Sequence, residues 1–369
     1  MQKCHEPTTS APTAKRGFSL LDRRLRLRRD SWSERVVREA AWLGTMQPSF
    51  CVAAETFSRL TGVWMSDTTV WRRHQEVTDQ LETQVRAEEE DVRCPVYRGQ
   101  EPKAYDPIQE HVSVSVDGTT VLIRDEGYRE VKIVSVSEVL LRPGKELADD
   151  SATLTTQPRG RQDGLELTRH SYRAALGDKA TFEPVLQTEL ARRRVTTAAK
   201  VTNVNDGADW PWDLAARYLP AQRTEVLDWP HAMQNLSKAA DAAWGEGAQQ
   251  AHAWLAERET ELWAGHVLDV QVALEQLPRR RKACGKAIRQ VKDYVARHKA
   301  RMDYQRFREE GRPIGSGAVE SAAKNVVGWR LKRGGQSWSR AGCTRMLAAL
   351  GEMHSGRWQE ACTRLTRAA

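Results

Sequence analysis

Cysteine is sparse in this sequence, and no two cysteines stand at a metal-binding spacing. The six cysteines are scattered over 369 residues with no C-x-x-C pair, which argues against a zinc ribbon and against a disulfide framework. No apolar run approaches the roughly 18 residues of a membrane-spanning helix, and the N-terminus lacks the apolar stretch of a signal peptide. These absences predict a protein of the reducing cytoplasm that has no membrane partner.

Phenylalanine is also scarce, with 5 residues against 13 tryptophans. Packing in a core or between lobes is the ordinary role of tryptophan, and stacking on nucleic-acid bases is the alternative. The tryptophans close to charged motifs are Trp71, Trp210, Trp212, Trp229, Trp329 and Trp338.

Charge is abundant and unbalanced. Lys and Arg number 57 against 49 Asp and Glu, which gives a formal charge of +8. Such an excess suits a polyanionic partner without identifying one. With 40% hydrophobic residues over 369 positions the chain can bury a large core, and its length predicts two or more lobes.

Apolar periodicity predicts an N-terminal helical region followed by an α/β domain with a mixed sheet. Alternating runs predict strands at 112–116, 128–139, 167–176, 196–204 and 225–227, with a helix at 182–194 before the fourth strand. This is the element order of a ribonuclease H-like (RNase H-like) domain. The pattern beyond residue 231 is helical, which predicts an all-helical insertion before the last helix of that domain.

The chain thus divides into seven predicted parts. They are a disordered leader and basic arm (1–30), a helical DNA-binding region (31–92), a linker (93–110), the first part of the α/β domain (111–232), the helical insertion (233–310), the final helix of the α/β domain (311–350) and a C-terminal tail (351–369).

A helix-turn-helix is predicted within 31–92. Thr61-Gly62-Val63 ends one helix, and Ser66 is placed to cap the next. That next helix carries Arg72, Arg73 and His74 at polar positions, where they could contact DNA. A helical hairpin in a bundle has the same outline, so this alternative stays open.

Three acids stand at the ends of predicted elements. Asp117 closes the first strand, where Asp117-Gly118 predicts a tight turn, and Asp206 closes the fourth. Glu320 lies in the first turn of the helix that follows the glycine-rich Pro313–Gly317 segment. Neighbouring parallel strands would bring the two aspartates to one sheet edge. Turn formation and the helix dipole are the ordinary explanations for each acid alone.

Together these acids have the oxygen ligands that two Mg²⁺ ions require, with Mn²⁺ as a possible substitute. Two metal ions at such a site activate a water or hydroxyl and stabilise the leaving oxygen when a phosphodiester is broken. We therefore predict Asp117, Asp206 and Glu320 as catalytic metal ligands. Asp228 also follows an apolar strand, with His231 three residues on. We prefer Asp206 as the ligand and treat Asp228 and His231 as auxiliary, but the choice stays open.

Positive charge surrounds the last acid. Lys324, Arg330, Lys332 and Arg333 follow Glu320 along the predicted helix. Counterion release from such a stripe would dominate its affinity for DNA of any sequence. A solvated basic helix face is the alternative.

These motifs resemble the ISKra-type insertion-sequence transposases, which are related to the Mutator-like transposases with an Asp-Asp-Glu (DDE) site. The resemblance spans about residues 17 to 350. Its motifs are Val116-Asp117-Gly118, Gly127-Tyr128-Arg129-Glu130-Val131-Lys132, Asp206-Gly207-Ala208-Asp209-Trp210, Leu227-Asp228-Trp229-Pro230-His231-Ala232, Pro313-Ile314-Gly315-Ser316-Gly317-Ala318-Val319-Glu320-Ser321 and Arg330-Leu331-Lys332.

The resemblance implies a DDE transposase with an RNase H-like catalytic domain, an all-helical insertion and a preceding helix-turn-helix. Asp117, Asp206 and Glu320 match the metal-binding triad, while Asp228 and His231 match the acid-x-x-His signature of the Mutator relatives. Its substrates would be double-stranded element ends and target DNA, held by a homodimer or larger assembly in the cytoplasm, at the nucleoid when DNA is bound. Family members often carry a longer, cysteine-containing N-terminus, so we expect a shortened copy.

Two other functions remain open from sequence. A decayed transposase or DNA-binding regulator would use the helix-turn-helix without catalysis. An RNase H-like nuclease would cleave nucleic acid without joining strands.

Overall fold

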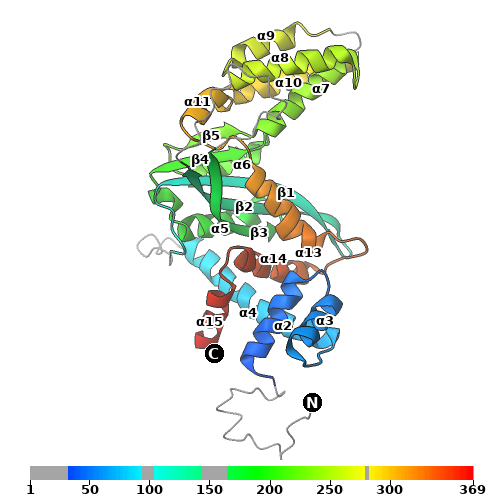
Figure 1. The fold of residues 1–369 in the computed structure, drawn as a ribbon, viewed down its shortest axis with the longest axis vertical. Helices are drawn as coiled ribbons and strands as arrows, with labels where there is room; N and C mark the ends of the chain where they lie inside the picture. The colour runs from blue at the N-terminus through cyan, green and yellow to red at the C-terminus, as the bar shows by residue number, and fades with distance from the viewer. Residues whose placement is uncertain (1–31, 94–103, 143–163, 279–281, 369) are drawn as a thin grey trace, which may run out of the picture. The chain divides into compact units, whose positions relative to one another are not determined.

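In the computed structural model the described residues are 32–93, 104–142, 164–278 and 282–368 (Figure 1). They form two compact units that divide between Thr78 and Asp79. The division falls inside a long helix and not in the predicted linker, of which residues 94–103 lie outside the described part. The leader and basic arm predicted over 1–30 lie outside it as well.

The first unit is helical. It contains α2 (Glu34–Met46), α3 (Phe50–Thr61) and the beginning of α4 (Asp67–Arg93). Its core includes Ala40, Phe57 and Val70, whose side chains are at most 2% exposed. Apolar residues at helical spacing therefore give this unit a small core of its own.

The turn between α3 and α4 forms as the sequence predicts. α3 ends at Thr61, and Gly62 takes the left-handed conformation at φ +69° that favours glycine at a helix end. The Ser66 hydroxyl accepts the amide of Thr69 at 3.2 Å, so the predicted cap of α4 is confirmed.

The exposure predicted for the basic residues of α4 is only partly right. Arg72 is exposed, but Arg73 is half-buried and pairs with Glu76 at 2.9 Å. His74 is buried at 1% exposure, with its ring edge-on to Phe50 at 5.2 Å. Its helical position turns His74 into the core of this unit, so it is not a surface contact here.

The second unit is built on a five-stranded mixed sheet of order β3-β2-β1-β4-β5. β1 pairs antiparallel with β2, and β2 with β3, whereas β1 and β4, and β4 and β5, are parallel. The predicted mixed α/β class is confirmed. The strands are β1 (His111–Ile123), β2 (Gly127–Leu141), β3 (Leu165–Leu176), β4 (Lys200–Asn205) and β5 (Thr224–Leu227).

The tight turn predicted at Asp117-Gly118 is wrong. β1 continues through these residues to Ile123, and Asp117 pairs across to Ile133 of β2. The chain reverses instead where Asp125 and Gly127 have positive φ values of 63° and 75°. The antiparallel partner β2 extends past the end of β4 and keeps the Asp-Gly dipeptide in the ladder.

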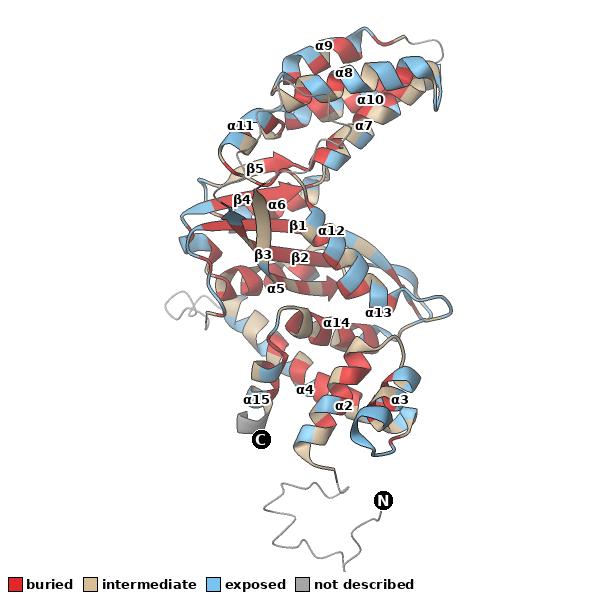
Figure 2. Cartoon of the chain, in the orientation of Figure 1, coloured by how far each residue is buried: buried red, intermediate tan, exposed pale blue. Residues whose placement is uncertain are grey.

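Helices cover both faces of this sheet (Figure 2). Val112, Val114 and Val116 face α5 (Lys179–Arg192) and α6 (Asp209–Tyr218) in one buried cluster. Because side chains alternate along a strand, Asp117 points to the opposite face. On that face β1 and β2 contact the helix that carries Glu320.

Helices follow β5 up to the Glu320 segment, with no further strand among the described residues there. A shared core of Leu236, Leu262, Leu274 and Ile288 holds them together. The helices are α7 (Trp229–Trp244), α8 (Gln249–Trp263), α9 (Val267–Glu275), α10 (Lys282–His298), the 3-10 turn η3 (Lys299–Arg301) and α11 (Tyr304–Glu309).

The last part of the chain is also helical. α12 (Gly317–Ala322) runs into a π-helical turn, η4 (Ala323–Gly328), and into α13 (Trp329–Leu331). α14 (Arg340–His354) and α15 (Trp358–Ala368) follow. Residues 351–368 are therefore not the predicted tail, because Trp358 and Cys362 are buried and fix this segment in helices.

The sequence predicts neither a disulfide framework nor a membrane-spanning helix, and the described residues bear on both predictions. Cys51, Cys284, Cys343 and Cys362 are all free thiols. Within the described part of the chain, no helix has the length and apolar character that crossing a bilayer requires.

Candidate metal centre

Three aspartates meet at the edge of the sheet where parallel pairing ends. β1 pairs with β4 as far as Val114 with Asn203, and β4 pairs with β5 as far as Asn205 with Leu227. Continued along the strands, these registers set Asp117 beside Asp206, and Asp206 beside Asp228. The level of the sheet at which parallel pairing ends thus gathers acids that are far apart in sequence.

Buried asparagines hold β1 and β4 together just before this edge. The Asn205 side chain accepts a hydrogen bond from the Val116 amide at 2.9 Å, and its Nδ2 donates to the side-chain Oδ1 of Asn203 at 2.8 Å. Asn203 in turn donates to the Val114 carbonyl at 3.0 Å. Sequence reasoning missed both residues, although two asparagines that flank Val204 in a buried strand were a visible signal. They fix Asp117 and Asp206 by holding the residues just before them.

Asp228 is buried at 0% exposure, and its carboxylate forms three hydrogen bonds. One carboxylate oxygen accepts the His231 amide at 3.0 Å and lies 2.6 Å from His231 Nδ1. The other accepts the Ser316 amide at 2.6 Å. Asp228 therefore caps α7, orients the imidazole and fastens the glycine-rich turn to the end of β5.

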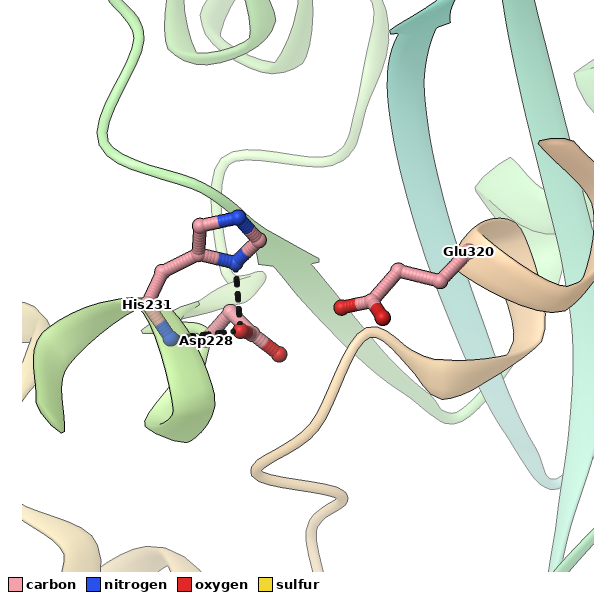
Figure 3. Close-up of side chains that lie close together, drawn as sticks. All are labelled: Asp228, His231 and Glu320. Carbon is pink, nitrogen blue, oxygen red and sulfur yellow. Dashed lines mark hydrogen bonds and ion pairs between the residues drawn. The ribbon is translucent and has the colours of Figure 1, made fainter. Parts of the chain in front are cut away.

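That turn places Glu320. The Trp229 amide donates to the Ile314 carbonyl at 2.9 Å, and the Ser316 hydroxyl donates to Glu320 Oε1 at 2.9 Å. Ligand atoms of Asp228, His231 and Glu320 all lie within 4.8 Å of one another (Figure 3). The described residues thus contain an acid and histidine cluster that could hold a metal ion.

The acids of this edge act on one another electrostatically. Burial raises the pKa of Asp117 above its ordinary value of 3.8, and the charges of Asp206 and Glu320 raise it further, against the Gly118 amide and His231. The hydrogen bond from Asp228 raises the pKa of His231, and Asp206 and Glu320 add to the effect. The carboxylates thus lie close enough to shift the pKa values of their neighbours, and the electrostatic potential at this edge is negative.

Asp206 occupies a tight turn at the end of β4. Its Oδ1 accepts the Ala208 amide at 3.0 Å, and Gly207 packs against the Tyr294 ring. A Cβ on Gly207 would lie 2.0 Å from Tyr294 Cε2, so this glycine is required by close approach. Burial, followed by the charges of Asp206 and Asp228, raises the pKa of Tyr294, a neighbour that sequence reasoning missed.

The donor set of this edge fits a hard divalent cation. Carboxylate oxygens are the ligands that Mg²⁺ and Mn²⁺ prefer, and a cation would offset both the burial and the neighbouring charges that raise the pKa of Asp117. Asp228 fits the role of ligand less well, because three hydrogen bonds already occupy much of its acceptor capacity. The choice of Asp117, Asp206 and Glu320 as ligands stays a prediction.

The basic residues after Glu320 divide into two kinds. Lys324, Lys332 and Arg333 are exposed, and Lys332 Nζ bonds the Thr119 hydroxyl of β1. Arg330 is buried at 2% exposure with its guanidinium 4.9 Å from the Trp338 ring centroid. Burial lowers the pKa of Arg330 to about 10. Arg330 is therefore a packing residue, and its guanidinium is not exposed along the helix as the predicted basic stripe requires.

No family model matches this chain, and a search of curated proteins finds no match.

Proposed function

We propose that this chain is a DDE-type transposase of a bacterial insertion sequence, which cleaves DNA at the element ends and joins the freed strand to target DNA. The observation that carries the proposal is the acidic sheet edge, where Glu320 lies close to Asp228 and where the charges of Asp206 and Glu320 act on Asp117. Acids gathered without matching cations are unfavourable for folding, and such perturbed groups cluster at functional sites.

The proposed fold is an RNase H-like sheet interrupted by a helical insertion. The sheet order β3-β2-β1-β4-β5 with two parallel pairs supports the first part. The helices α7 to α11, between β5 and the Glu320 helix, support the second. The insertion separates Asp228 from Glu320 in sequence, while the Asp228–Ser316 hydrogen bond joins its two ends in space.

Each residue of the site has a proposed role in cleavage and joining. Asp117, Asp206 and Glu320 would hold two Mg²⁺ ions, which when bound relieve the charge on the phosphate and activate the attacking oxygen. Asp228 orients His231 and fixes the turn before Glu320. A water molecule would first break a phosphodiester at the element end, which frees a 3′-hydroxyl and leaves a 5′-phosphate on the other fragment. That hydroxyl would then attack a phosphate of target DNA at the same site and displace the target's 3′-oxygen. Positioning is therefore the chain's main contribution.

DNA would be held by the exposed cations, with Arg72 on α4 and Lys324, Lys332 and Arg333 beyond Glu320. Each such residue would contact phosphates without reading sequence. Because two element ends react together, we propose a homodimer or larger assembly on paired DNA ends, acting in the cytoplasm at the nucleoid.

The test is a cleavage assay with Asp117→Asn. The substrate is a plasmid that carries the DNA flanking both sides of the gene, incubated with Mg²⁺. The wild-type chain should release ends with free 3′-hydroxyls and yield joined products, whereas Asp117→Asn should bind the same DNA and lower the cleavage rate at least about 1000-fold. Asp213→Asn, the same change at an exposed acid on α6, is the matched control.

The other functions are distinct outcomes of this assay. Cleavage that never yields joined strands would identify a nuclease. Binding of the flanking DNA without cleavage in Mg²⁺ or Mn²⁺ would identify a regulator or a decayed enzyme. Loss of binding and cleavage together in Asp117→Asn would overturn the metal role of that residue.

A further inference from the structure

An exposed tryptophan lies on the same helical segment as Glu320. The Trp329 side chain is 54% exposed, although it belongs to a compact unit with a large core. Leu331, two residues further on, is buried at 1%. The segment thus has a packed side and a solvent side, and Trp329 belongs to the solvent side.

Polar and basic residues surround this indole along one side of the segment. Asn325 donates to Ser321 at 3.0 Å, and Lys324 and Lys332 are exposed. The Arg333 guanidinium lies 5.0 Å from the Trp329 ring centroid, within the range of a cation–π contact. We call these residues the Trp329 stripe: Ser321, Lys324, Asn325, Trp329, Lys332 and Arg333.

The backbone of this segment is wider than an α-helix. Residues Ala323–Gly328 form a π-helical turn between Glu320 and Trp329. π-Turns are rare and often mark functional sites. At no more than about 1.5 Å per residue, nine residues place Trp329 within about 13 Å of Glu320 along the helix, a span of at most about four nucleotides of a DNA strand.

We propose that Trp329, together with Arg333, is a stacking platform for an unpaired DNA base a few nucleotides from the scissile phosphate. A flat indole beside lysine and arginine matches both parts of a single strand, the base face and the phosphate chain. Paired bases inside a duplex cannot expose a face to it, so the ligand is a frayed or extruded nucleotide. The inference rests on the proposed action on DNA and names a contact within it.

The test compares single-stranded with double-stranded binding in the full chain without metal, so that it does not depend on cleavage. Fluorescence anisotropy would measure Kd for a labelled 20-nucleotide strand and for the duplex of the same sequence. Trp329→Ala should weaken single-strand binding about 10-fold and duplex binding less than about 2-fold, because stacking and phosphate contact are separate contributions.

Two further variants separate stacking from apolar packing. Trp329→Phe keeps a ring and should retain most of the affinity, whereas Trp329→Leu keeps apolar bulk and should lose it like alanine. Leu268→Ala, at an apolar residue of α9 that is 68% exposed, is the matched control and should change neither Kd. A thermal melt of each variant confirms that it is folded.

Several results would contradict the proposed stacking platform at Trp329 or give the residue another role. Equal affinity of the leucine and phenylalanine variants, or equal loss for single and double strands, would overturn the platform. Self-association lost in Trp329→Ala with unchanged DNA affinity would identify an interface between copies of the chain instead. If the single-strand preference holds while the wild-type chain cuts no DNA, the proposed function fails and the stacking site stands.

Discussion

The second unit contains two clusters of acids whose pKa values are shifted in opposite directions. At the sheet edge, Asp117 has a raised pKa because burial and neighbouring acids disfavour its charge. In the packing between α5 and the C-terminal helices, Glu189 is fully buried, yet the Arg357 guanidinium lowers its pKa to about 2 against the effect of burial. Burial alone therefore does not decide the charge state of an acid in this chain.

The difference lies in how each cluster is partnered. Glu189 accepts two hydrogen bonds from Arg357, at 2.7 and 2.8 Å, and one from Ser171 at 2.6 Å. Nearby, Arg192 donates to the buried Glu352 at 2.7 Å. Each acid there has a guanidinium, which is the condition for retaining a buried charge. Among the described residues, no arginine forms an ion pair with Asp117, Asp206 or Glu320 at the sheet edge, as expected if a cation from solution completes that site.

The largest expected effect comes from breaking an ion pair in the cluster around Glu189, where each acid has an arginine partner. Glu189→Gln leaves the Arg357 charge buried without its partner, so the free energy of unfolding should fall by about 3–5 kcal/mol in urea denaturation. Glu183→Gln on the same helix, whose Arg217 partner is 55% exposed, should lower it by less than about 1 kcal/mol. Similar values for the two variants would refute the contrast between the clusters.

A divalent cation should stabilise the chain through the acid cluster at the sheet edge and not through the cluster around Glu189. At 100 times its Kd, Mg²⁺ should raise the free energy of unfolding of the wild-type chain by about 2.7 kcal/mol, because only the folded chain gathers the ligands. Glu189→Gln should keep this increment and Asp117→Asn should lose most of it, measured by urea denaturation with and without Mg²⁺. An increment unchanged in Asp117→Asn would place the cation elsewhere.

Sequence could predict the elements that bring the acids together because each depends on local chemistry. The strands were visible as alternating apolar runs, and the Gly62 end and the Ser66 cap as helix signals. The turn at Asp117-Gly118 was wrong because strand pairing with β2 overrides a turn propensity. A local pattern cannot show how far a partner strand extends.

Side-chain environment was harder to predict than element order. The sequence pattern places Arg330 and His74 on the polar sides of their helices, but packing buries both side chains. The three-way hydrogen bonding of Asp228 joins residues 88 positions apart at Ser316, so no local pattern contains it. Which acid organises the site and which binds metal therefore depends on tertiary contacts.

Asp228→Asn tests that division of roles, with a smaller effect. Because an amide cannot satisfy the His231 and Ser316 donors together, the free energy of unfolding without metal should fall by about 1–3 kcal/mol. Asp206→Asn, which loses one acceptor to Ala208 at a half-buried position, should change it less. If Asp206→Asn has the larger effect without metal, Asp206 is the organiser and the assignment reverses.

The smallest effect is in the pH dependence of stability, where the two clusters should have slopes of opposite sign. Asp117 binds its proton more readily in the folded chain, so its contribution to stability falls as pH rises above the ordinary value of 3.8. Glu189 binds its proton less readily when folded, so its contribution is complete above 4.5 and is lost as pH falls toward about 2. Urea denaturation in EDTA across pH 2 to 7 should show that Asp117→Asn removes the first slope and Glu189→Gln the second. Loss of both slopes in one variant would mean that the clusters are coupled through the sheet, and the site would then no longer be electrostatically separate from the scaffold that holds it.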